Sequence, residues 1–359
     1  MKNKTSERYA EERPNVLAAR RAGRIKNALW LTAVAGLSLV LTGCSLSGGP
    51  RARWGFTPNG SFGDPERLGT HSYGLSGSEG FGIFYTLLGG SIDLDHLRGS
   101  ADITKCAYDR AFKAVRKTKR SFSVSPALEF TTNKVRIEYP PGWKELTQAE
   151  KDRIAHEAAL TIAPVVGYNS TLWHEMLTWK GTHFAVIEPE HTSAFSWDDL
   201  YSNLVGAELA VEAIKGGDTS TGDYNRAMTV LIKKELERLQ IVPKQKAAQI
   251  TGSVRGTWYG SRRLIRRNMD AGYDDGQVTP SIIPGYTDQP PITRPIPTLE
   301  SLDKLGIKVK YTISSIYLED AELQRIAGVK GAVEPLKHYA KIMENIRREA
   351  VEKYNYLIH

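Results

Sequence analysis

The stretch Asp93–Thr118, DLDHLRGSADITKCAYDRAFKAVRKT, sets the fold class expected for this chain. Its apolar side chains recur mostly at spacings of three and four residues, the period of an amphipathic helix. They are Leu94, Leu97, Ala101, Ala107, Ala111 and Val115. In the rest of the chain, helical patterns also outnumber strand patterns. We therefore expect a single α+β domain that is predominantly helical and carries a few short strands.

The strand patterns are few and short. We expect one strand at Gly82–Leu88, a hairpin of Ala127–Thr131 with Lys134–Tyr139 that turns near Thr132-Asn133, and a late strand at Ile307–Leu318. Residues 270–300 are rich in proline and glycine. A segment of this length without regular structure is usually a covering loop or a functional one.

Start and stop signals mark the other helices. Thr147-Gln148-Ala149-Glu150 is a capping box and opens a helix that Pro164 and Gly167 should bend or end. A second helix would then begin near Asn169 or Ser170 and end at Gly181. The remaining helical patterns are a helix from Ser196, as its N-cap, to Ala213, then Tyr224–Leu239, a helix from Pro243 to Trp258-Tyr259, and Val333–Tyr354.

The N-terminal residues carry the pattern of a secretory signal. A basic run precedes an apolar run from Ala28 to Leu41, and Thr42, Gly43 and Cys44 follow. This order resembles a bacterial lipoprotein signal. The resemblance implies that residues 1–43 are removed and that Cys44 becomes a lipidated N-terminus, with a diacylglycerol thioether and an acyl chain such as palmitate. An uncleaved membrane helix is the alternative, but the apolar run is 14 residues long and a spanning helix needs about 20.

The same resemblance gives a location and a domain plan. Ser45 follows the cysteine where inner-membrane lipoproteins often have aspartate. We therefore expect the protein in the cell envelope, lipid-anchored to the outer membrane on its periplasmic face. Residues 44–80, rich in Gly, Ser, Pro and Arg, are expected to be a tether and irregular lead-in, and residues 81–359 the globular domain.

The net charge and the two cysteines limit which partners the chain is expected to have. The whole chain carries +8, but residues 1–43 hold eight Lys and Arg against three Asp and Glu, so only +3 remains in the rest. This weak surplus does not support a nucleic-acid partner. Cys106 has no partner within the chain if Cys44 is lipidated, and we expect it to be a buried structural thiol.

Three blocks of polar residues stand out. They are Ser91–Arg98 (SIDLDHLR) followed by Asp102, then Trp173–Trp179 (WHEMLTW), and Ser193–Gly206 (SAFSWDDLYSNLVG). At these blocks the chain resembles a family of uncharacterised bacterial lipoproteins, known as a domain of unknown function, over most of residues 80–350. The resemblance implies an envelope location and supplies no reaction, substrate or cofactor.

Histidines and carboxylates in these blocks suit a divalent metal such as zinc. The chain lacks the zincin pattern, because Leu160 lies four residues after His156 and Thr178 four residues after His174. A metal site would have to be assembled from separate helices. We expect His96, His156 and His174 as metal ligands, His174 and Glu175 as catalytic base or ligand, and Asp93, Asp199, Tyr201 and Asn203 as binding residues, with Asp93 orienting His96.

Two classes of function fit these residues. One is a hydrolase of the cell envelope that acts on a polymer or peptide with the help of a metal. The other is a non-catalytic binding or scaffold lipoprotein, in which the same polar groups fix helix packing and a surface near Trp258-Tyr259 and residues 270–300 meets the cell wall or an envelope protein. Convergence of His96, His174 and Glu175 in an open cleft would favour the enzyme, whereas scattered or sealed positions would favour the scaffold. Nucleotide binding has no support, because no glycine-rich phosphate loop is present.

Overall fold

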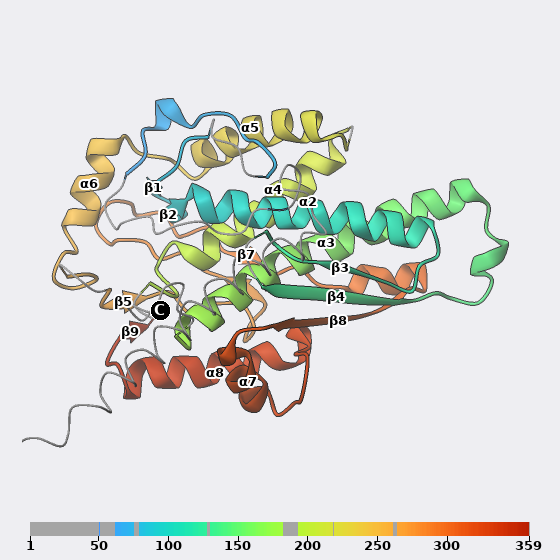
Figure 1. The fold of residues 1–359 in the computed structure, drawn as a ribbon. Helices are drawn as coiled ribbons and strands as arrows, with labels where there is room; N and C mark the ends of the chain where they lie inside the picture. Colours follow the sequence, from blue (N-terminus) through green and yellow to red (C-terminus); the bar gives the residue numbers. More distant parts are fainter. Residues whose placement is uncertain are drawn as a thin grey trace, which may run out of the picture. The chain divides into compact units, whose positions relative to one another are not determined.

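Helix α2 (Leu94–Arg116) runs along two further helices, α3 (Gln148–Trp179) and α4 (Asp199–Lys215) (Figure 1). The computed structural model describes Pro50 and residues 62–74, 79–127, 130–181, 193–217, 219–260 and 264–358. All of them belong to one structural unit, residues 47–359. The predicted signal segment, Cys44 and Ser45 lie outside the described residues. The predominantly helical α+β class is confirmed.

Helix α3 is one helix of 32 residues, so the predicted break at Pro164 and Gly167 is wrong. Thr147 does form the predicted capping box with Glu150. Proline removes one backbone N–H, and the buried side chains on both sides of Pro164 keep the helix packed. At Gly167 a Cβ atom would lie 1.9 Å from Thr104 Oγ1 of α2. This glycine therefore serves the close approach of α2 and α3 rather than a helix end.

The main sheet is antiparallel and has the order β3 (Ser121–Val124), β4 (Thr131–Glu138), β8 (Lys308–Ser315). The predicted turn at Thr132-Asn133 is wrong, because both residues lie inside β4, opposite β8. Buried and exposed residues alternate without interruption along β4. Asn133 is buried and satisfied: its Nδ2 donates to Val124 O and Ser170 Oγ, and its Oδ1 accepts from the Tyr311 hydroxyl.

The other elements surround this framework. A hairpin of β1 (Ile83–Thr86) and β2 (Gly90–Asp93) leads into α2. Helix α6 ends at Gly252, short of the predicted Trp258-Tyr259, and helix α7 was not predicted. The remaining elements are α5 (Thr221–Arg238), α6 (Lys244–Gly252), α7 (Leu318–Ala327), α8 (Pro335–Glu352), the short turns η1 (Pro65–Arg67), η2 (Trp143–Glu145) and η4 (Glu300–Leu305), and the two-residue strands β5 (Arg266–Arg267) with β9 (Leu357–Ile358) and β6 (Gln277–Val278) with β7 (Arg294–Pro295).

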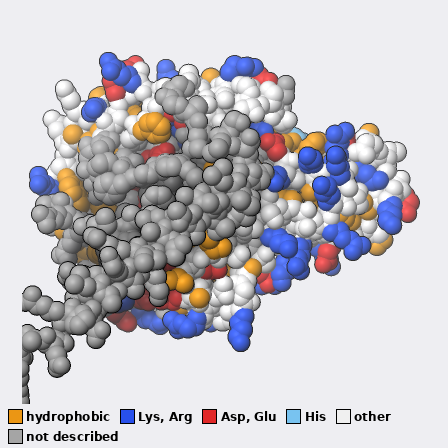
Figure 2. Space-filling view, in the orientation of Figure 1, with side chains coloured by type: hydrophobic (Ala, Val, Ile, Leu, Met, Phe, Trp, Pro, Cys, Tyr) orange, Lys and Arg blue, Asp and Glu red, His pale blue; other side chains and the backbone are white. Residues whose placement is uncertain are grey.

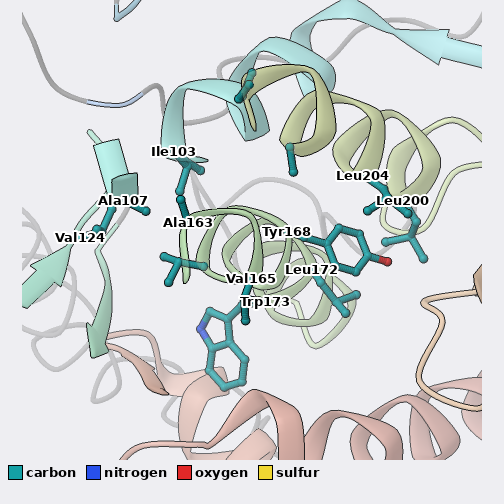
Figure 3. Close-up of a cluster of buried hydrophobic side chains, with 14 of the residues drawn as sticks. Ile103, Ala107, Val124, Ala163, Val165, Tyr168, Leu172, Trp173, Leu200 and Leu204 are labelled. Carbon is teal, nitrogen blue, oxygen red and sulfur yellow. The ribbon is translucent and has the colours of Figure 1, made fainter. Parts of the chain in front are cut away.

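The core is centred on α3 (Figure 3). Tyr168, Leu172 and Trp173 of this helix are fully buried. Burial of each large apolar side chain contributes about 1.5–3 kcal/mol, so α3 is a rigid support for the polar residues it carries. Cys106 is buried and carries no disulfide, as predicted. Among the described helices, none combines the length and apolarity that a bilayer crossing needs.

Residues 270–300 are tied to α4 and α5 through Ile292 and Arg294. Arg294 reaches under the surface and pairs with Glu208 of α4 and Glu235 of α5. Its Nε donates to the Tyr201 hydroxyl at 3.0 Å, and that hydroxyl donates to Ile292 O at 2.7 Å. The long irregular segment is thus held in place by a buried ionic network.

Basic side chains gather at the end where α2 finishes and α3 begins (Figure 2). The exposed members on α2, β4 and the segment between them are Lys113, Arg116, Lys117, Lys119, Arg120, Lys134 and Arg136. Lys134 and Arg136 lie on the solvent face of β4. This end of α2 is opposite to the end that carries His96.

The described residues before β1 are tied to α2 through a buried histidine. His71 Nε2 lies 3.1 Å from Asp102 Oδ1, and His71 Nδ1 lies 3.3 Å from Glu79 Oε1. Burial by itself would lower the pKa of His71, but Asp102 and Glu79 outweigh it and raise the pKa above 6.5. A raised pKa means that the folded protein binds this proton more tightly than the unfolded chain.

We expect the protein to lose stability as pH rises through the folded pKa of His71. The contribution is fully present below the unfolded value of 6.5 and disappears above the folded one. Urea unfolding at about pH 6 and about pH 9 measures it. The variant His71→Asn should lack this part of the decline, whereas His338→Asn on α8 should keep it. Equal declines in wild type and His71→Asn would contradict the assignment.

Candidate functional site

The three polar blocks meet where α2 begins, α3 ends and α4 begins. His96 lies in the first turn of α2, Glu175 near the end of α3, and Asp199 is the first residue of α4. His96 Nε2 lies 2.9 Å from Asp199 Oδ1 and 3.8 Å from Glu175 Oε1. All three side chains are at most 2 % exposed. We call His96, Glu175 and Asp199 the buried triad.

Asp93 holds His96 from the other side. Its Oδ2 lies 3.0 Å from His96 Nδ1, and its Oδ1 accepts from Asp95 N as the N-cap of α2. The two residues are three positions apart, so they face each other at the helix start. The backbone N–H of Asp93 donates to Ser202 Oγ of α4. The orientation of the imidazole is therefore fixed by two helices.

Phe195 and Ser196, just before α4, donate hydrogen bonds to the buried carboxylates. Phe195 N donates to Glu175 Oε2 at 3.1 Å, and Ser196 N donates to Asp199 Oδ2 at 2.7 Å. Ser196 Oγ bonds Asp198 Oδ1 and Asp199 Oδ1. The predicted N-cap role of Ser196 is wrong: Asp198 is the N-cap, without a side-chain cap bond. Phe195 has φ +56°, a left-handed conformation that non-glycine residues rarely adopt, and such strain often occurs at functional sites.

Negative charge is concentrated around the imidazole. Asp93, Glu175, Asp198 and Asp199 are all buried. Burial, with Asp199 and Asp93 nearby, raises the pKa of Asp198 to about 7. Arg267 is the buried cation that acts on Asp199 and Glu175, although burial lowers its own pKa. Among the described residues, these four carboxylates face one imidazole and one guanidinium. Because buried charges need compensation, the site has a surplus of negative charge.

The donor geometry suits a divalent metal. In a tetrahedral zinc site with bonds of about 2.0–2.2 Å, neighbouring ligand atoms lie about 3.3–3.5 Å apart. The 2.9 and 3.8 Å separations in the buried triad bracket that value. A second group, Asp93, His96 and Asp198, also brings its ligand atoms within 4.8 Å of one another. Imidazole with carboxylates is a donor set for zinc, iron or manganese.

A pocket opens beside the buried triad. Its empty volume is about 310 Å³, mouth included. Its lining comes from α2 (Asp95, His96, Gly99, Ser100 and Ile103), α3 (Thr171, His174 and Glu175) and α4 (Asn203). His96, His174 and Glu175 therefore line one pocket, while the side chains of His96 and Glu175 are at most 2 % exposed.

Residues 62–269, more than half of the chain, match a family profile described as a protein of unknown function (DUF4056). The chain belongs to the DUF4056 family. No curated protein and no solved structure matches it. The DUF4056 region contains α2, α3 and α4, hence the whole buried triad and the whole pocket lining. Helices α7 and α8 lie outside it.

Two residues that were expected at the site lie elsewhere in the DUF4056 region. His156 is eighteen residues before His174 in α3, about 27 Å along the helix, and its Nδ1 lies 2.7 Å from the Tyr108 hydroxyl. Tyr201 bonds Ile292 and Arg294. The structure thus does not bring His156 to the metal ligands or Tyr201 to the pocket. His174 lines the pocket without belonging to the buried triad.

Sequence reasoning missed several contributors to the DUF4056 site. Asp198 was not expected among the site residues, and Asp199 was expected as a binding residue rather than a metal ligand. The paired carboxylates Asp198-Asp199 after a serine were the available signal. Gly99 in the interior of a helical pattern was another signal. Arg267, far along the chain, offered none.

Proposed function

We propose that this DUF4056 protein is a lipid-anchored hydrolase of the cell envelope that uses a divalent metal such as zinc, held by His96, Glu175 and Asp199. One observation carries the proposal: both ring nitrogens of His96 face buried carboxylates. A neutral imidazole has a single N–H, so one of these contacts calls for a second proton or a cation. The surplus of buried carboxylates favours the cation.

The side chains around the pocket have distinct roles in this proposal. A divalent cation supplies Lewis acidity and lowers the pKa of water. Asp93 holds the His96 ring, as carboxylates commonly do behind metal-binding histidines. Phe195 N fixes one oxygen of Glu175 and leaves the other directed at His96. His174, half-buried in the pocket wall, would move a proton to or from the substrate.

The test uses the full-length protein in detergent, with and without zinc. Release of soluble fragments from isolated cell wall and from envelope peptides is measured. The zinc-loaded wild type should release fragments, and Glu175→Gln and His174→Ala should not. Glu157→Gln is the matched control, since Glu157 follows a histidine in the same helix but is exposed and pairs with Arg153. Equal activity in Glu175→Gln and Glu157→Gln would refute the proposal.

The anchor is a separate part of the proposal. The lipoprotein pattern ending in Cys44 supports attachment to the outer membrane, since two or more acyl chains suffice for stable anchoring. Cys44→Ser is expected to move the protein almost completely out of the outer-membrane fraction. Fractionation with immunodetection and intact-mass measurement check this. Retention of the variant in that fraction would contradict lipidation at Cys44.

A non-catalytic envelope-binding lipoprotein is the second candidate. The exposed basic side chains at the far end of α2 favour it (Figure 2), because such a surface attracts anionic lipids or polymers. The zinc comparison separates the two candidates. A binding protein would keep its envelope partner with or without zinc and would release no fragments.

A further inference from the structure

Two buried polar atoms in the pocket wall have no hydrogen-bond partner among the described residues. They are Ser100 Oγ on α2 and Asn203 Nδ2 on α4. Their residues are 0 % and 1 % exposed. An amide nitrogen carries two N–H donors and can accept nothing. Because buried donors are nearly always paired, these two atoms point to an oxygen-bearing ligand in the pocket.

Gly99 keeps the same pocket open. It lies in the interior of α2, where glycine is less favourable than alanine. A Cβ atom there would meet nothing within 4 Å, so packing does not require the glycine. At Gly167 and Gly206, by contrast, a Cβ would collide with α2. Empty space at Gly99 belongs to the pocket, and a side chain there would narrow it.

We propose that the pocket takes a small acyl group, of acetyl size, carried as an ester or amide on a larger envelope molecule. Its carbonyl oxygen would accept from Asn203 Nδ2 and Ser100 Oγ, beside His96 and Glu175. The empty volume of about 310 Å³ includes open space at the mouth, so the enclosed part of the pocket admits only a small group. Ile103 and Thr171 complete the wall. This proposal rests on the proposed hydrolase and narrows its substrate to a removable acyl group.

The reaction balances as a hydrolysis. The oxygen of water forms a bond to the acyl carbon, and the bond from that carbon to the ester oxygen or amide nitrogen breaks. The leaving oxygen or nitrogen takes one proton from water, and the acyl group departs as a carboxylate. The second proton is released to solvent or is taken up by the amine. No oxidant or reductant is needed. The Asn203 N–H groups would stabilise the charge that develops on the carbonyl oxygen.

Acetamide, a neutral molecule that carries the same acyl group, serves as the probe in titration calorimetry on the full-length protein, with and without zinc. Asn203→Leu removes the donors at similar size and is expected to weaken acetamide binding about tenfold while leaving zinc affinity unchanged. Gly99→Ala should weaken acetamide binding and yet raise the melting temperature. Thr178→Val is the matched control, because Thr178 Oγ1 is also buried without a hydrogen-bond partner among the described residues but lies outside the pocket.

The outcomes separate this proposal from the proposed function. Acetamide binding that is sensitive to Asn203→Leu and Gly99→Ala but not to Thr178→Val supports it, even if zinc does not bind. If zinc did not bind, only the metal part of the proposed function would be refuted. Absence of acetamide binding to the wild type would overturn the acyl pocket. So would wild-type affinity in both Asn203→Leu and Gly99→Ala. If Gly99→Ala does weaken binding, its added stability excludes misfolding as the cause.

Discussion

Replacement of His96 with alanine is expected to lower the zinc affinity of the protein by roughly a hundredfold or more. The imidazole stands between Asp93 and Asp199 and supplies the nitrogen donor of the buried triad. Glu175→Gln and Asp199→Asn should lose affinity similarly, and Asp93→Asn less, by roughly tenfold, since outer residues usually contribute 10–100-fold. Competition with a chromophoric chelator measures the affinities. A zinc concentration 1,000 times the dissociation constant should stabilise the wild type by about 4 kcal/mol.

The matched control is His156→Asn, in the same helix as Glu175 but bonded to Tyr108. It should bind zinc as the wild type does. Because removal of one charge from a buried cluster can also unfold the protein, each variant is compared by circular dichroism before titration. A folded His96→Ala protein with wild-type zinc affinity would show that the buried triad is not the metal site.

The second large effect is expected at Gly206 of α4. A Cβ atom there would lie 2.0 Å from Leu97 O and 2.8 Å from Leu97 C of α2. These are backbone atoms inside a helix, so they cannot turn aside as a side chain could. Gly206→Ala should force α4 away from α2 and lower the free energy of unfolding by roughly 3 kcal/mol. Urea unfolding measures this loss.

Gly222→Ala in α5 is the control for this prediction. Its Cβ would lie 3.6 Å from Arg226 Nη1, the end of a flexible side chain. The change should stay within about 1 kcal/mol, because alanine is favoured over glycine in helices. If Gly206→Ala is no more destabilising than Gly222→Ala, the close packing of α2 and α4 described here is incorrect. Since Leu97 follows His96, Gly206→Ala should also weaken zinc binding.

Local signals predicted part of the fold well. The three- and four-residue spacing of apolar side chains gave α2, and the capping box gave the start of α3, because both depend on neighbours within one turn. Pro164 and Gly167 were misleading for a tertiary reason: packing of α3 against α2 offsets one lost hydrogen bond and needs a small residue. The partner of β4 could not be predicted locally, since β8 lies about 180 residues further along the chain.

The site was predictable in its chemistry and less so in its geometry. Asp93 and His96 are three residues apart, so their contact follows from helix geometry. His156-Glu157 and His174-Glu175 look alike in sequence, and only packing places one pair beside His96 and the other beside Tyr108. The contribution of Asp198 and Arg267 depends on burial, which no short motif reveals.

Anomalous X-ray scattering at the zinc edge, from crystals of the protein grown with zinc, tests the central claim most directly. We expect one strong peak within bonding distance of His96 Nε2, Glu175 and Asp199, with Asp93 still against His96 Nδ1. A map with no peak there, and with His96 Nε2 still bonded to Asp199, would contradict a metal centre in this protein.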